Sequence, residues 1–168
     1  ERLKKIIHNY DALAIRSNTN VDKEILLLSS NLKVIGRAGI GVDNIDIDYA
    51  TSKGIIVMNT PHGNSITTAE HTIAMIMSLA RQIPDANVST KKGKWEKSKF
   101  VGTEITGKKL GLIGCGNIGS IVVDRAKGLK MNVQVYDPFL TDDKSKELGI
   151  EKVSFENLSL FLSCDSIS

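Results

Sequence analysis

The sequence predicts an α/β fold made of two doubly wound parallel-sheet domains, both incomplete in this chain. Short apolar segments recur throughout and lack the apolar–polar alternation of half-buried strands, which predicts sheets covered on both faces. Helix-like segments separate these strands, as helical crossovers between parallel strands require. A glycine-rich turn at 114–119 connects a strand-like segment to a helix-like one, which indicates a nucleotide-binding sheet.

The first part of the chain alternates three strand-like segments with two helix-like ones. The expected strands are 12–16, 32–36 and 55–59. A helix over 21–30 has Asn20 or Thr19 available as its N-terminal cap. A shorter helix over 44–54 ends at Gly54, a residue that readily adopts the left-handed conformation after a helix.

The longest expected helix, over 64–83, separates a first domain of residues 1–63 from a second domain of residues 64–168. Its apolar residues cover more than one face, which predicts a helix buried between domains. Pro84 interrupts the pattern, and we expect a solvated lysine-rich loop through 91–99.

The second domain opens a new series of alternating strands and helices. The expected elements are a strand at 110–113, a helix at 117–129, a strand at 132–137, a polar helix at 141–149, an amphipathic helix at 154–163 and the start of a strand at 164–168. Because the sequence begins with Glu1 and ends within an expected strand, we expect it to be part of a longer protein.

Composition excludes several classes of function. The 168 residues are 41% hydrophobic and 24% charged, an ordinary globular balance, and the net charge is +3. This charge is too small to predict nucleic-acid binding, and it mildly favours small anionic ligands. No apolar run approaches the roughly 20 residues that a membrane span needs, so we expect no membrane partner.

The two cysteines, Cys115 and Cys164, have neither the spacing of a disulfide framework nor that of a metal site. We therefore expect a cytoplasmic protein without a metal. Cys115 lies between two motif glycines, where a small side chain fits. A reactive thiol, activated by the N-terminus of the following helix, is the alternative interpretation.

Three glycines follow the expected strand 110–113 in a GxGxxG pattern. Gly114 permits a sharp turn, Gly116 lets a pyrophosphate approach the backbone, and Gly119 lets the helix pack closely on the strand. The N-terminus of that helix offers free N–H donors to phosphates. Asp137 ends the next strand, where it would accept ribose hydroxyls and repel a 2′-phosphate, which favours NAD over NADP.

Two arginines, Arg16 and Arg37, end the first two strands, at the edge where open α/β sheets bind ligands. Gly39 and Gly41 free the following backbone to form a nest of N–H groups, which suits a carboxylate or a phosphate. Arginine adds a bidentate charged contact to such a group. A surface arginine pair beside ordinary turn glycines is the alternative.

None of the three histidines is predicted to be catalytic. His62 lies in a turn-forming segment, His71 is expected as a core histidine of the apolar helix, and His8 lies on a charged surface helix. A general base at His62 is the alternative.

Four motifs occur together and in one order: RAGIGVDNIDI, NTPHGNSITTAEHT, GKWEKSKFVGTEITGKKLGLIGCGNIG and YDPF. Together they resemble the D-isomer-specific 2-hydroxyacid dehydrogenase family over nearly the whole chain. The segment that begins with GKW resembles the branch of the family that acts on 3-phospho-D-glycerate.

The resemblance implies a flavodoxin-like substrate domain that lacks its first strand, and the first half of a Rossmann NAD domain. It implies NAD as the cofactor, a small anionic 2-hydroxy or 2-oxo acid as the substrate, and a homodimer or larger oligomer. The candidate cofactor-binding residues are Ile40, Gly114, Gly116, Asn117, Ile118, Gly119 and Asp137. The candidate substrate-binding residues are Arg16, Arg37, Gly39, Ile40, Gly41 and Val42.

The activity implied by the resemblance is NAD-dependent oxidation of 3-phospho-D-glycerate to 3-phosphooxypyruvate in serine biosynthesis. The family's catalytic Arg, Glu and His have no counterpart in these residues, so we expect no turnover by this chain alone. Two alternatives stay open: a dehydrogenase for another 2-hydroxy acid, such as a glyoxylate or hydroxypyruvate reductase, and a non-catalytic NAD-sensing interaction protein.

Overall fold

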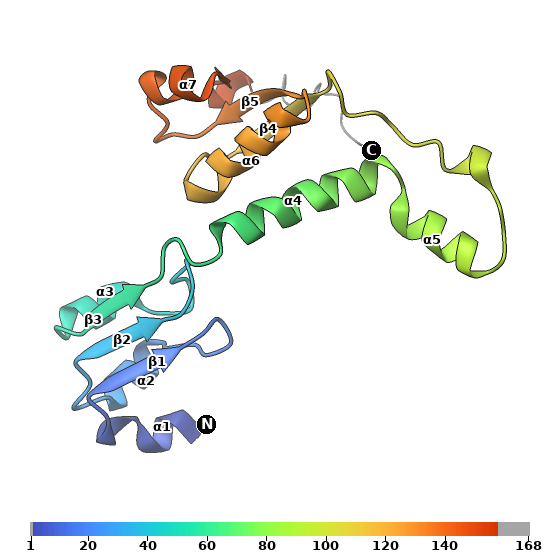
Figure 1. The fold of residues 1–168 in the computed structure, drawn as a ribbon. Helices are drawn as coiled ribbons and strands as arrows, with labels where there is room; N and C mark the ends of the chain where they lie inside the picture. The colour runs from blue at the N-terminus through green and yellow to red at the C-terminus, as the bar shows by residue number, and fades with distance from the viewer. Residues whose placement is uncertain (1, 158–168) are drawn as a thin grey trace. The chain divides into compact units, whose positions relative to one another are not determined.

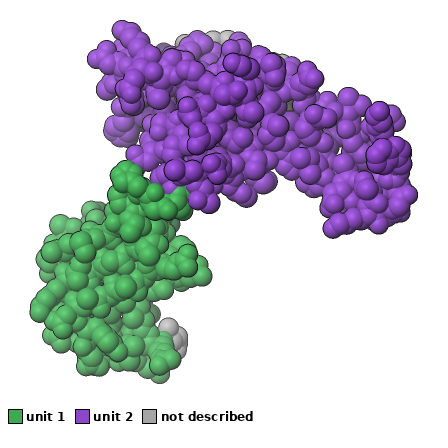
Figure 2. Space-filling model, in the orientation of Figure 1, with its two compact units in different colours: residues 1–64 green, residues 65–168 purple. Residues whose placement is uncertain are grey.

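A computed structural model describes residues 2–157 and confirms the α/β class, with helices between the strands of two parallel sheets (Figure 1). The chain divides into two compact units, Glu1–Asn64 and Ser65–Ser168 (Figure 2). Each unit has one sheet and its own hydrophobic core.

The first unit contains three parallel strands in the order β1–β2–β3, which confirms the three expected strands. They are β1 (Ala12–Ile15), β2 (Val34–Arg37) and β3 (Ile56–Asn59). The register pairs Ile15 with Arg37 and Arg37 with Asn59, so the strands end at one edge of the sheet. The helical elements are α1 (Arg2–Ile6), the 3-10 turn η1 (Ile7–Asn9), α2 (Lys23–Leu28) and α3 (Ile47–Ser52).

The helix α2 begins later than its apolar pattern predicts. Asp22 accepts a hydrogen bond from the backbone N–H of Ile25 at 3.0 Å and caps the helix. The expected cap at Asn20 or Thr19 is therefore wrong. The physical reason is that Val21 takes part in a β-bridge, which holds the preceding backbone extended.

The short helix α3 ends as predicted. Asp46 caps its start by accepting the backbone N–H of Tyr49 at 3.0 Å. Gly54 follows its last turn with a φ of +72°, the left-handed conformation expected of a glycine after a helix.

The core of the first unit includes Ile7, Leu26 and Ile35, which are fully buried. The strand β3 is less buried than these core residues, since Ile56 is 62% exposed and Met58 is 56% exposed. Within residues 2–157 this strand is therefore not covered on both faces, contrary to the expectation from its apolar sequence.

The strand order corrects the match to a flavodoxin-like sheet. In the order 2-1-3-4-5, strands 3, 4 and 5 are consecutive neighbours, whereas strands 2 and 3 are separated by strand 1. The observed order β1–β2–β3 therefore corresponds to strands 3, 4 and 5. The expectation named a first strand as lacking, and by this order strand 2 is not among the three strands either.

The second unit begins with α4 (Ser65–Ala80), which is shorter than the expected helix. The helix is interrupted at Gln82, whose φ of 51° is left-handed, and a separate helix, α5 (Ile83–Lys91), follows. Pro84 lies in the first turn of α5, where its missing N–H breaks no hydrogen bond. Pro84 thus starts a helix that the sequence did not predict, and the expected lysine-rich loop follows it and leads to the 3-10 turn η2 (Lys97–Lys99).

The helix α4 is buried along one side only. Ala69 and Ala80 are buried, and Ile73 and Met77 contact the core of the unit. Met75 and Leu79 lie on the opposite side and are each 58% exposed, and Ile66, near the start of the helix, is also 58% exposed. The predicted burial of this helix on all sides does not hold for the described residues. No helix in that part of the chain is long and apolar enough to cross a membrane.

The second sheet has the order β4–β5–β6, all parallel, which matches one half of a dinucleotide-binding sheet. Its elements are β4 (Lys109–Ile113), α6 (Asn117–Gly128), β5 (Asn132–Tyr136), α7 (Asp142–Leu148), β6 (Glu151–Lys152) and the 3-10 turn η3 (Phe155–Asn157). The strands β4 and β5 and the helices α6 and α7 confirm the prediction, and β6 adds to it. The helix expected over 154–163 lies mostly outside the described residues, and the strand expected from 164 lies wholly outside them.

Candidate functional site

The glycine turn between β4 and α6 brings the helix against the strand that precedes it. Gly114 leaves the strand with a φ of +92°, which a residue with a side chain adopts only under strain. A Cβ on Gly119 would lie closer to the carbonyl oxygen of Gly114 than the 3.0 Å that real Cβ contacts respect. Both glycines are therefore required by the fold of the turn itself.

The middle glycine is different. Gly116 occupies the N-cap position of α6, with no side chain to bond the free N–H groups of the first turn. A Cβ on Gly116 would meet no protein atom within 4 Å. Neither crowding nor backbone strain requires a glycine here, so the turn leaves open space in front of a helix N-terminus. Such a space fits the pyrophosphate of a dinucleotide.

Asp137 follows β5 and faces this turn. One of its carboxylate oxygens accepts the backbone N–H of Cys115 at 2.6 Å, and the other accepts the backbone N–H of Phe139 at 2.7 Å. These hydrogen bonds hold the pKa of Asp137 below its usual value, with the Cys115 N–H the strongest cause. The carboxylate thus stays ionised at neutral pH. It also ties the glycine turn to β5, a contact that the sequence did not predict.

Cys115 has a free, partly buried thiol. Burial raises the pKa of this thiol, and the nearby Asp137 carboxylate raises it further, while Lys144 acts in the opposite direction. The net direction opposes thiolate formation, so the alternative of an activated thiol is wrong. The small-side-chain interpretation of Cys115 fits its place in the turn.

Asn117 and Ile118 form the first turn of α6. Asn117 is exposed and follows Gly116, which holds the cap position of the helix. Ile118 is partly buried beside Gly119. The structure therefore gathers all six candidate cofactor residues of this unit around one turn.

A hollow of about 490 Å³ opens beside the turn. Cys115, Gly116 and Asp137 line one part of it, and Phe139 and Lys144 line another. The donors of the helix N-terminus and the open backbone at Gly116 suit the phosphate groups of a dinucleotide, and the ionised acid is an acceptor that suits ribose hydroxyls.

The first unit brings the candidate substrate residues together at the ends of β1 and β2. Arg37 donates from Nε to the side-chain oxygen of Asn44 at 3.2 Å. Asn44 in turn donates to the carbonyl oxygens of Arg16, at 3.2 Å, and Thr19, at 2.6 Å. Asn44 therefore connects the two arginine-bearing strand ends. Asn44 was not predicted from the sequence as a site residue. The only signal for it is a side-chain amide in a turn that follows the glycines.

The loop after Arg37 does not form the nest that we expected at its glycines. Neither Gly39 nor Gly41 has a positive φ, and the Gly39 N–H donates to the carbonyl oxygen of Arg37 at 2.9 Å. Gly39 instead makes room for the Arg37 guanidinium, which a Cβ would strike. Within the described residues, the backbone N–H groups of Ile40, Gly41 and Val42 donate no hydrogen bond. These three groups are thus available to an anionic ligand.

The position of the loop is fixed from β3. The side-chain amide of Asn59 donates to the carbonyl oxygen of Ile40 at 2.8 Å, and the Thr60 N–H donates to that of Gly39 at 3.0 Å. Since these contacts hold the carbonyls of Gly39 and Ile40, they help to fix the loop without using the N–H groups of Ile40, Gly41 and Val42.

All three histidines are exposed. His62 is exposed in the turn before α4, as expected. His71 is exposed on α4, so the expected core position is wrong, because that side of the helix is uncovered. His8 is exposed in η1. Among residues 2–157, no group of three or more His, Cys, Asp or Glu side chains could hold a metal ion.

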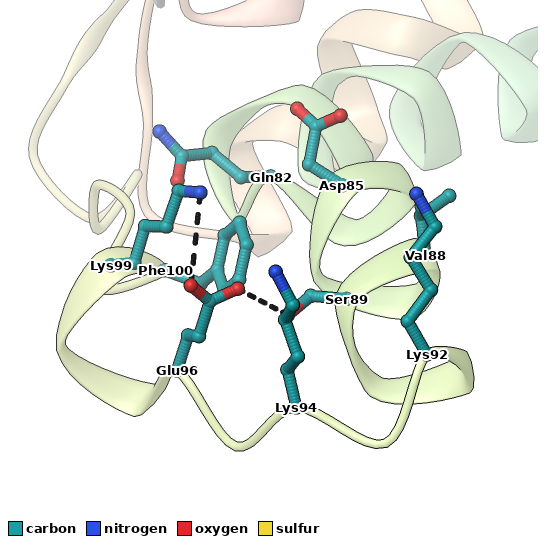
Figure 3. Close-up of a pocket in the computed structure, with 9 residues that line it drawn as sticks. All are labelled: Gln82, Asp85, Val88, Ser89, Lys92, Lys94, Glu96, Lys99 and Phe100. Atoms are coloured by element: carbon teal, nitrogen blue, oxygen red, sulfur yellow. Dashed lines mark hydrogen bonds and ion pairs between the residues drawn. The ribbon is translucent and has the colours of Figure 1, made fainter.

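A second hollow, of about 420 Å³, lies between α5 and the lysine-rich segment (Figure 3). Glu96 accepts a hydrogen bond from the Ser89 hydroxyl at 2.6 Å and lies 4.0 Å from the Lys99 ammonium. The Ser89 hydrogen bond is the main cause that lowers the pKa of Glu96. Its negative charge offsets the lysines around it, so we do not assign this hollow to an anionic ligand.

The glycine turn of one unit and the loop with three free N–H groups in the other both follow the carboxyl ends of parallel strands, where open α/β sheets bind ligands. The model of the D-isomer specific 2-hydroxyacid dehydrogenase catalytic domain matches residues 1–165, and the chain belongs to this family.

Its relatives include proteins named D-3-phosphoglycerate dehydrogenase. That of Archaeoglobus fulgidus is 49% identical over 158 residues, which are 94% of this chain and 30% of the relative. That of Bacillus subtilis is 50% identical over 152 residues, which are 90% of this chain and 29% of the relative. The chain thus spans about a third or less of the length of these relatives.

Solved structures show the same fold. The D-lactate dehydrogenase of Aquifex aeolicus, complexed with NAD and lactic acid, is 30% identical with a TM-score of 0.85, over 92% of this chain and 46% of that chain. A formate dehydrogenase of Granulicella has a TM-score of 0.89 at 24% identity, over 96% of this chain and 44% of that chain, and shows the fold alone.

Proposed function

We propose that the second unit holds NAD, and that the protein carrying this chain uses NAD to oxidise 3-phospho-D-glycerate to 3-phosphooxypyruvate in serine biosynthesis. The observation that supports it most is the open space at Gly116 beside the ionised Asp137 carboxylate. The names of relatives close to 50% identical support the choice of substrate.

The candidate cofactor residues would bind different parts of NAD. The N–H groups at the start of α6 would hold the pyrophosphate, and Asp137 would accept the adenosine ribose hydroxyls. When bound, the nicotinamide ring supplies the acceptor for the substrate hydride. The likeness to the Aquifex aeolicus enzyme complexed with NAD supports this cofactor. The role of Ile40 near the nicotinamide is carried by the family resemblance alone.

The substrate residues are those of the first unit. The free N–H groups of Ile40, Gly41 and Val42 would bind the substrate carboxylate, and the two arginines would add charged contacts to an anion. No histidine of the chain is assigned the role of proton acceptor. The division into a substrate domain, 1–63, and a cofactor domain, 64–168, is part of this proposal, and a cytoplasmic location stays a prediction.

Gly116→Ala tests the cofactor site. The backbone at Gly116, with φ −75° and ψ −153°, suits alanine, and a Cβ meets no protein atom, so the fold should be unchanged. The methyl group should instead occupy the space of the pyrophosphate and weaken NADH binding by about 100-fold. Calorimetric titration with NADH measures this, and circular dichroism checks the fold. Unchanged NADH affinity in the folded variant would contradict the proposed site.

We further propose that the protein is a homodimer or a larger homo-oligomer. The support is the row of exposed apolar side chains on α4 and α5, including Met75 and Leu79, each 58% exposed, and Ile83, 52% exposed. Light scattering should give a mass at least twice that of one chain, and Met75→Lys should shift it toward the monomer. A monomeric mass at micromolar concentration contradicts this proposal.

A further inference from the structure

The hollow beside the glycine turn is lined by two opposite charges, one acid and one lysine. Asp137 lies at the end of β5, and Lys144 is the one cation among the described residues that line this hollow. The hollow measures about 490 Å³, which is ample for a phosphate group. The assigned roles of the cofactor site use Asp137 and leave Lys144 without a function.

The Lys144 ammonium is available to a ligand. It contacts both carboxylate oxygens of Glu147 at 2.9 Å, on the same side of α7, and the two side chains are 49% and 67% exposed. An exposed pair of this kind contributes little to stability, since solvent screens it. The ammonium can therefore leave Glu147 for a stronger anion at low cost.

The charges of Asp137 and Lys144 act on the same space. The Cys115 thiol, which lines the hollow, has its pKa raised by Asp137 and lowered by Lys144. An anion in the hollow is thus repelled by the first charge and attracted by the second. As long as Asp137 is ionised and held by two backbone N–H groups, repulsion acts at the position nearest the ribose.

We propose that this hollow is a latent phosphate subsite, in which Lys144 receives the 2′-phosphate of NADP once the Asp137 carboxylate is neutralised. The reason is that an acid at this strand end accepts the ribose 2′-hydroxyl, so a phosphate on that oxygen is directed into the adjoining hollow. Cofactor choice is then set by two residues, with Asp137 excluding the phosphate and Lys144 able to bind it. The inference rests on the proposed NAD site.

The test compares NADPH binding in three variants of the full-length protein. Asp137→Asn should tighten NADPH binding by about tenfold, because it removes the repelling charge and keeps the side-chain shape. Asp137→Asn with Lys144→Met should lose that gain. Asp137→Asn with Lys146→Met is the matched control, since Lys146 is an exposed lysine of α7 that does not line the hollow, and it should keep the gain.

Titration with 2′,5′-ADP and 5′-AMP shows whether the change in affinity depends on the 2′-phosphate. Lys144→Met in the Asp137→Asn background should weaken 2′,5′-ADP and leave 5′-AMP unchanged, since only the former carries the 2′-phosphate. If Asp137→Asn fails to fold because Cys115 loses its anchor, Asp137→Ser takes its place in the same comparison.

Equal NADPH affinities for the Lys144→Met and Lys146→Met double variants would overturn the inference, as would the lack of any gain from neutral Asp137 variants that still bind NADH. A wild-type protein that binds neither NADH nor NADPH would instead contradict the proposed function.

Discussion

Replacing Gly119 by alanine should lower the free energy of unfolding by about 2 kcal/mol and abolish NADH binding. The added Cβ would overlap the Gly114 carbonyl oxygen, which is backbone and cannot rotate away. The N-terminus of α6 must then move away from β4, so its N–H groups would no longer point toward the proposed position of the phosphates. Urea unfolding followed by circular dichroism measures the first effect, and calorimetric titration with NADH measures the second.

The control for this substitution lies on the same helix. Gly128 is the last residue of α6, and a Cβ there would meet nothing within 4 Å. Gly128→Ala should leave NADH binding unchanged and stabilise the fold by about 0.5 kcal/mol, because alanine has less freedom to lose on folding. Equal destabilisation by Gly119→Ala and Gly128→Ala would contradict the close approach of α6 to β4.

Gly119 and Gly116 are thus expected to be glycines for two different reasons. Gly119 is needed by the fold, since protein atoms fill the space of its missing side chain, whereas Gly116 faces open space. A loss of NADH binding without a loss of stability at Gly116, and a loss of both at Gly119, is the pattern that a pyrophosphate site in front of Gly116 predicts. A turn that served only to pack helix on strand would lose neither stability nor NADH binding at Gly116.

The elements that the sequence predicted well are those whose signal is local. The strands β1 to β5 each carry a short apolar segment bounded by polar or turn residues, and the GxGxxG spacing alone places the start of α6. Gly54 and Gly149 end their helices with left-handed φ values, as glycines after helices do. Such features depend on a few neighbouring residues, so they can be derived without the tertiary structure.

The elements that it predicted poorly depend on distant residues. A proline is compatible both with the end of a helix and with the first turn of a new one. At Pro84 the left-handed conformation of Gln82, two residues earlier, decides for the first turn of α5. The burial of α4 depends on what covers each side, which periodicity does not reveal. In the site, Asn44 and the bond from Asp137 to the Cys115 backbone join residues far apart in the sequence, so no local pattern indicates them.

Replacing Arg16 by alanine should raise KM for 3-phospho-D-glycerate by about 100-fold and for D-glycerate by only a few-fold. Arg16 follows β1 at the ligand-binding edge of the sheet, and within the described residues its guanidinium makes no hydrogen bond or ion pair. An exposed arginine without protein partners is free to form a bidentate contact with a phosphate. Steady-state kinetics of the full-length protein on both substrates measures the difference.

Two further variants make the Arg16 result specific. Arg2→Ala removes an exposed arginine from α1 of the same unit and should change neither KM, so it controls for net charge. Arg16→Lys should recover part of the affinity for the phosphorylated substrate, because it keeps the charge and loses the planar fork. Equal increases in KM for the two substrates would mean that Arg16 does not contact the phosphate, and the proposed substrate would then lose its main support in the first unit.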